Sequence, residues 1–112
     1  MTFDDVKDLA EKFPGVVEDT HYGTRALKVK GQMFVRLRED GETLVVRCDM
    51  ISRDLMLKVE PKLFFITDHY KNFPAILLRL KAVKTKRMRE ILEDAWRFRA
   101  PKKLVAEYDA KG

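Results

Sequence analysis

The sequence predicts an α+β domain with two layers, in which a mostly antiparallel sheet of about five or six strands carries helices packed on one face. Three observations lead to this prediction. Helical and strand-like segments follow one another in the order α-β-β-β-β-α-β-β-α-α. The strand-like segments are mostly separated by short turns, which favours hairpins and antiparallel pairing. The length of 112 residues suits one domain, so we expect a single domain over residues 1–112.

The first element expected is a helix that Thr2 can cap. Pro14 and Gly15 end it, and strand-like patterns follow as far as Cys48. The apolar stripe of this helix consists of Phe3, Val6, Leu9, Ala10 and Phe13, and the strands are expected over 16–21, 25–29, 33–38 and 43–48.

Two hairpin registers follow from the turns between these strands. Asp40-Gly41 is a strong signal for a two-residue turn, which places Leu37 opposite Leu44 and Val35 opposite Val46. A three-residue loop at Lys30–Gln32 places Leu27 opposite Val35 and Val29 opposite Met33. One face of the sheet then holds Met33, Val35, Leu37, Leu44, Val46 and Cys48, and the other holds Lys28, Phe34, Arg36, Arg38, Val45 and Arg47.

The second half of the chain predicts three helices and two strands. A short helix capped by Asp49 or Ser52 ends near Val59, and its apolar side is Leu55, Met56 and Val59. Strands over 63–66 and 75–80 flank a polar loop, 67–74. Thr85 caps a helix over 86–99 with a stripe of Met88, Ile91, Leu92, Ala95, Trp96 and Arg99, and Pro101 starts a last helix that ends near Tyr108. Trp96, Phe64, Phe65, Phe73 and Phe98 are expected in the core.

Composition excludes several classes of protein. The single cysteine, Cys48, excludes an internal disulfide and a thiolate metal cage. No apolar run approaches the roughly 20 residues that span a bilayer, so we expect no membrane partner. The first residues lack the basic and apolar regions of a secretory signal, which predicts a cytoplasmic location.

The formal net charge of +5 is concentrated near the C-terminus. Residues 84–103 hold eight basic and three acidic side chains, whereas the rest of the chain is nearly balanced. A local basic excess is typical of proteins that bind polyanions. The alternative is a solvated helix face, on which Lys86 and Arg89 pair with acids four residues later. Lys84, Lys86, Arg87 and Arg89 are therefore one candidate nucleic-acid patch.

The outward sheet face is the leading candidate for a nucleic-acid site. An aromatic ring among basic side chains could stack on bases while the cations contact phosphates. The candidate residues are Lys28, Phe34, Arg36, Arg38 and Arg47. The alternative is an ordinary solvated face with one exposed aromatic residue.

No catalytic motif, phosphate-binding glycine loop or metal-ligand spacing occurs in the sequence, so we expect no enzyme activity and no cofactor. The two histidines lie in similar motifs, Asp19-Thr20-His21-Tyr22 and Thr67-Asp68-His69-Tyr70, and their loops could form a small-molecule or protein-interaction site. That site would use His21, Tyr22, His69, Tyr70 and Phe73. A third hypothesis is weak cation binding by the acidic first helix, through Asp4, Asp5, Asp8 and Glu11 followed by Glu18 and Asp19.

Several short motifs make the sequence resemble the MmcQ/YjbR-like family over roughly residues 3–108. They are Phe13-Pro14-Gly15, Thr20-His21-Tyr22-Gly23, Phe65-Ile66-Thr67-Asp68-His69-Tyr70, and the segment from Ala95-Trp96-Arg97 through Lys103-Leu104-Val105. The resemblance implies a frataxin-like (CyaY-like) two-layer arrangement and a proposed DNA-binding role through two hairpin wings. In this chain the wings would be Lys30–Gln32 and Glu39–Glu42, of which the second is acidic.

Overall fold

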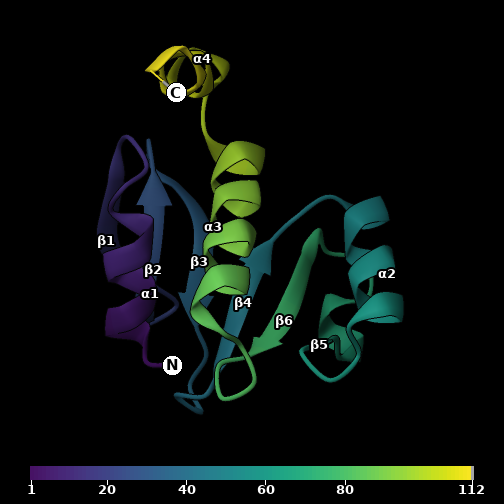
Figure 1. The fold of residues 1–112 in the computed structure, drawn as a ribbon. Coiled ribbons are helices and arrows are strands. Elements are labelled where there is room, and N and C mark those ends of the chain that lie inside the picture. Colours follow the sequence, from purple (N-terminus) through teal and green to yellow (C-terminus); the bar gives the residue numbers. More distant parts are fainter. Residues whose placement is uncertain (112) are drawn as a thin grey trace.

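The computed structural model describes residues 1–111, and in them six strands form one antiparallel sheet with four α-helices packed on it (Figure 1). The predicted α+β class is therefore confirmed. The strand order is β1-β2-β3-β4-β6-β5, and every neighbouring pair is antiparallel. The elements are α1 (Phe3–Ala10), β1 (Val16–His21), β2 (Thr24–Val29), β3 (Gln32–Leu37), β4 (Thr43–Arg47), α2 (Met50–Val59), β5 (Phe64–Phe65), the 3₁₀ turn η1 (Asp68–Tyr70), β6 (Ala75–Arg79), α3 (Thr85–Arg99) and α4 (Lys102–Lys111).

The helices α1 and α3 cover one face of the sheet, which we call the core face (Figure 1). Thr2 and Asp5 close α1 with a capping box, as the sequence favours at a helix start. The predicted stripe of α3 is buried from Met88 to Trp96. None of the helices in residues 1–111 is long and apolar enough to cross a membrane.

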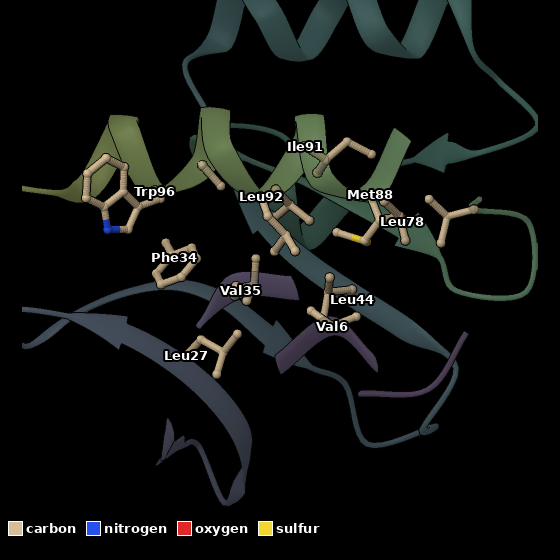
Figure 2. Packing of buried hydrophobic residues seen from close by; sticks show 14 of the residues in the cluster. Val6, Leu27, Phe34, Val35, Leu44, Leu78, Met88, Ile91, Leu92 and Trp96 are labelled. Atoms are coloured by element: carbon tan, nitrogen blue, oxygen red, sulfur yellow. The ribbon is translucent and has the colours of Figure 1, made fainter. Parts of the chain in front are cut away.

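The interior between α3 and the sheet is filled by large apolar side chains of the helix and of strands β2 to β6. Figure 2 shows Trp96, Leu92 and Met88 of α3 facing Phe34, Val35 and Leu44 of the sheet. These side chains are almost fully buried, and each stabilises the fold by about 1.5–3 kcal/mol relative to an exposed position. The contacts fix α3, and therefore its C-terminal end, against β3.

A β-bulge in β3 changes which side chains face the core. Leu27 pairs with Val35 as predicted, but the next residue, Lys28, pairs with Met33, so Phe34 is an extra residue. Phe34 therefore points to the same side as Val35 and is fully buried (Figure 2). The prediction of an exposed stacking ring at Phe34 is wrong, and Met33, predicted in the core, lies on the opposite face.

The hairpin turns differ in length from the prediction at two places. Lys30 and Gly31 form a two-residue turn, both with positive φ, so Val29 pairs with Gln32 rather than Met33. The loop between β3 and β4 is longer than the predicted Asp40-Gly41, because the Asp40 carboxylate accepts from the backbone N–H groups of Glu42 and Thr43. The apolar register beyond it is confirmed, with Leu37 opposite Leu44 and Val35 opposite Val46.

The second helix buries an arginine instead of its predicted apolar side. Leu55 and Val59 are 61% and 66% exposed, whereas Arg53 is buried. The Arg53 guanidinium donates to the carbonyl oxygens of Tyr70, Lys71 and Phe73 at 2.9, 3.1 and 3.3 Å. This side chain replaces the expected apolar contact because it saturates the backbone carbonyls of the neighbouring loop.

The segment 66–74 folds over the face of the sheet that α1 and α3 leave open, which we call the outer face. A small second cluster of Val45, Tyr70, Ala75 and Leu77 packs beneath it. Phe73 and Phe98, expected in the core, are 39% and 40% exposed. This segment forms one wall of a cavity on the outer face.

Candidate anion-binding site

A cavity of about 450 Å³ lies on the outer face between β3, β4 and the segment 66–74. Residues from the turns at both ends of β2, Tyr22 and Gly31, also line it. All five residues of the predicted pocket line it, which brings the two histidine segments together. The full lining is His21, Tyr22, Gly31, Gln32, Met33, Arg36, Val45, Arg47, His69, Tyr70, Phe73 and Arg99.

The charge of this lining has one sign. Three arginines, Arg36, Arg47 and Arg99, contribute to the wall, and no aspartate or glutamate of the described chain does. The volume falls in the range of about 300–1,000 Å³ that small-molecule sites occupy. The cavity therefore has the size and charge of a site for a small anion with an apolar part.

Arg36 is held rigidly at the floor of the cavity. It is buried, and its guanidinium donates to Thr24 Oγ1 at 3.0 Å and to the Tyr70 hydroxyl at 3.4 Å. Glu39 lies 3.3 Å away and balances part of its charge. Because most of its N–H groups are already bonded, Arg36 mainly fixes the shape of the floor.

Arg47 presents its charge with fewer partners. Its Nε donates to the carbonyl oxygen of Pro74 at 3.0 Å, and its guanidinium carbon lies 4.6 Å from the centre of the Phe73 ring. Within residues 1–111, no carboxylate lies within salt-bridge distance of it. Burial, and then the positive charge of Arg99, lower the pKa of Arg47.

Arg99 approaches the cavity from the end of α3. Its Nη2 donates to the side-chain oxygen of Gln32, whereas its Nε is buried without a hydrogen-bond partner in the described structure. Buried donors are normally paired, because an unpaired one loses its hydration without compensation. Arg47 and Arg99 thus bring two guanidinium groups to the lining of one cavity, and neither has a carboxylate partner within residues 1–111.

Burial and the positive charges around the cavity both lower the pKa of His21. Burial is the largest cause that lowers its pKa, and the charges of Lys28, Arg36 and Arg47 lower it further. Its ring contacts that of Tyr22, with 4.5 Å between the ring centres. A neutral His21 can accept or donate a hydrogen bond to a ligand without adding to the positive charge.

The family model YjbR matches residues 11–98 of the chain. The chain belongs to the YjbR family. This confirms the resemblance drawn from the sequence phrases, and the matched region includes every pocket residue except Arg99.

Two curated relatives of this YjbR domain are uncharacterized proteins of mycobacteria. Rv2570 of Mycobacterium tuberculosis (strain ATCC 25618 / H37Rv) and Mb2600 of Mycobacterium bovis are each 37% identical to it over 49 residues. That match covers 44% of this chain and only 38% of either relative. The crystal structure of the Deinococcus radiodurans protein DR2400, family-model domain DUF419, has the same fold, with a TM-score of 0.70 at 18% identity over 85% of this chain and 75% of that one.

The YjbR domain holds the predicted basic residues of the sheet at or beside the cavity. Arg36 and Arg47 line it, and the Arg38 guanidinium lies 5.9 Å from the ring centre of Tyr70. Lys28 pairs with Asp19 at 3.2 Å. Phe34 is the one member of this set that the bulge removes from the outer face.

The second candidate patch lies at the start of α3, on the core-face side of the sheet. Lys84, Lys86 and Arg89 are exposed there. Arg87 pairs with Glu60 at 2.6 Å and with Glu90 at 3.4 Å, so its charge is balanced inside the domain. This patch and the cavity cannot act as one surface, because the sheet separates them.

The acidic residues of the first helix and β1 serve mainly as partners of basic side chains. Arg25 lies 2.7 Å from Asp4 and 2.6 Å from Glu18. Asp5 accepts from the backbone of Thr2 in the capping box. In the part of the chain that the structure describes, no group of three or more potential ligands is arranged to hold a metal ion.

Sequence reasoning missed Arg99, Gln32 and Met33. Helical spacing puts Arg99 in the apolar stripe of its helix, and a charged residue at a core-facing position is the signal that could have identified it. Met33 could not be recognised, because its direction depends on the bulge at Phe34.

Proposed function

We propose that this YjbR domain is a non-enzymatic binding module whose outer-face cavity takes up a small anionic molecule. The observation that carries the proposal is the wall itself, with three arginines, several aromatic rings and no carboxylate among its described residues. Charge-assisted hydrogen bonds from guanidinium groups are roughly twice as strong as neutral ones.

The strongest anchor for an anion is the pair Arg47 and Arg99. The positive charge of Arg99 disfavours the charged form of Arg47, and an anion bound beside both would offset that repulsion. Binding would therefore place a negative charge beside two arginines that have no carboxylate partner within residues 1–111.

We propose binding rather than catalysis because the chain's one thiol is unsuited to nucleophilic chemistry. Cys48 lies outside the cavity lining, and burial raises its pKa to about 12. A thiol in that state is almost fully protonated near neutral pH and is a poor nucleophile.

DNA is a second candidate ligand, supported by Lys28 and Arg38 beside the cavity on the same face. Together with Arg47 they could contact successive phosphates. The hairpin wings give less support. Lys30–Gln32 and Glu39–Glu42 lie at opposite ends of β3, about 20 Å apart at the usual strand rise, and Glu39 is already paired with Arg36.

The test is an amide NMR titration with inorganic phosphate in a phosphate-free buffer at about 150 mM salt, where nonspecific attraction is weak. We expect saturable shifts at Gln32, Arg47 and His69, which Arg47→Gln abolishes. Arg89→Gln removes the same charge at an exposed site on α3 and should leave the titration unchanged. Shifts spread equally over all basic residues would overturn the proposal.

A parallel titration with a short DNA duplex separates the two candidates. If DNA is the ligand, shifts should extend over Lys28 and Arg38, and inorganic phosphate should compete weakly. If the duplex leaves the outer face unchanged while phosphate binds, the DNA candidate falls.

A further inference from the structure

Tyr22 occupies an unusual position at the mouth of the cavity. It is the first residue of a two-residue turn with Gly23, and its φ is +54°. Bulky residues rarely adopt positive φ, and this turn type favours asparagine before glycine. The fold would thus be served better by asparagine at this place.

The Tyr22 ring makes few contacts that the fold requires. The residue is 81% exposed although it lines the cavity. The Arg36 guanidinium carbon lies 5.6 Å from its ring centre, and the His21 ring lies edge-on to it at 4.5 Å. No residue of the described chain forms a hydrogen bond with its hydroxyl group, so much of the ring surface stays available.

The cavity therefore has two chemically different parts. Arg47 and Arg99 supply the charge, and exposed rings of Tyr22, His69 and Phe73 surround the mouth. An anion alone would not use these rings, whereas a planar group attached to the anion would cover them. Strained residues that persist at a ligand site are often held for function.

We infer that the ligand is an aryl anion, a planar ring joined to a phosphate or carboxylate, whose charged group binds Arg47 and Arg99 while its ring stacks on Tyr22. This inference rests on the proposed function and names its ligand class. Any planar aromatic ring can stack on an aromatic side chain, whatever its substituents.

The experiment compares phenyl phosphate with methyl phosphate, which carry the same charged group, by NMR titration of the full chain. We expect wild type to bind phenyl phosphate roughly tenfold more tightly, the scale of one stacking contact. Tyr22→Asn should reduce that preference to near one without changing the affinity for methyl phosphate. Tyr22→Phe keeps the ring and should keep the preference.

The outcomes separate this inference from the proposed function. If neither phosphate binds, the proposed function itself fails. If wild type binds both equally, or if Tyr22→Asn keeps the preference, the cavity binds anions but Tyr22 is no stacking surface. Thermal unfolding is the control that Tyr22→Asn is folded. Because asparagine suits this turn, its melting temperature should equal or exceed that of wild type.

Discussion

The guanidinium of Arg47 contacts two aromatic rings, 4.6 Å from the centre of Phe73 and 5.9 Å from the centre of Phe98. Phe73 belongs to the segment over the outer face, and Phe98 lies at the end of α3. Arg47 thus contacts both the segment 66–74 and α3, the helix that carries Arg99. We expect Arg47 to have a structural role in addition to the binding role proposed above, and substitution can separate the two.

Arg47→Lys keeps the positive charge but removes the planar group and the bond from Nε to Pro74. We expect the free energy of unfolding to fall by about 1 kcal/mol, because a stacked guanidinium contributes about that much and an ammonium does not replace it. Urea denaturation measures the change. Arg89→Lys on the exposed face of α3 is the matched control, and equal stability of the two variants would contradict the structural role.

Phe34→Ala tests the β-bulge directly. The structure buries Phe34 completely beside Trp96, so we expect a loss of about 3–5 kcal/mol in the free energy of unfolding. Phe73→Ala, at a half-exposed ring, should cost clearly less. If Phe34→Ala were as mild as a surface substitution, the residue would point outward and the bulge would be wrong.

Arg53→Met tests how the outer-face segment is held. It removes the donor to three backbone carbonyls between Tyr70 and Phe73 and should destabilise the domain by about 2–3 kcal/mol. Amide hydrogen exchange should quicken most in residues 66–74. Asp54→Asn is a control on the same helix, since it affects the Arg53–Asp54 ion pair but leaves the carbonyl bonds intact. Uniform quickening over the whole domain in Arg53→Met would contradict a local role.

His21 gives the domain a pH dependence of known sign. Burial and nearby cations lower its folded pKa below the usual value of about 6.5. The unfolded chain therefore binds more protons between these two pKa values, so stability falls as pH drops from about 6.5 through the folded pKa. Histidine NMR titration should show the lowered midpoint, and His21→Gln should remove this part of the pH dependence of unfolding.

Phosphate should raise the pKa of His21, because a bound anion offsets the charges of Arg36 and Arg47. Arg47→Gln should raise it in the absence of phosphate. A His21 midpoint that ignores both changes would place the anion elsewhere in the domain.

The sequence predicted the fold class and most of the sheet because hairpin turns and alternating apolar residues are local signals. Leu37 and Leu44 pair as expected even though the loop between them is longer, since the buried face determines register more strongly than the turn. The bulge at Phe34 has no such local signal. Strict alternation sent Phe34 outward, and only packing against α3 places both it and Val35 inside.

The site was predictable in part. Repeated His-Tyr phrases marked both segments that meet in the cavity, although nothing in their spacing showed that they would meet. The exposed side of α2 was mispredicted for a related reason. Helical periodicity located an apolar stripe at Leu55 and Val59, whereas the carbonyl groups of a distant loop required Arg53 to be buried.

The fluorescence of the single tryptophan, Trp96, can be used to follow how distant segments pack together during folding. Trp96 donates its Nε1–H to the carbonyl oxygen of Pro14 at 3.0 Å, and its ring packs with those of Phe13 and Tyr108 in a cluster of three mutually contacting rings. We therefore expect the fluorescence of Trp96 to change when these segments pack around its indole. Stopped-flow fluorescence at this one residue would time the packing of residues 13–14 against α3 and α4, while far-ultraviolet circular dichroism would follow helix formation separately.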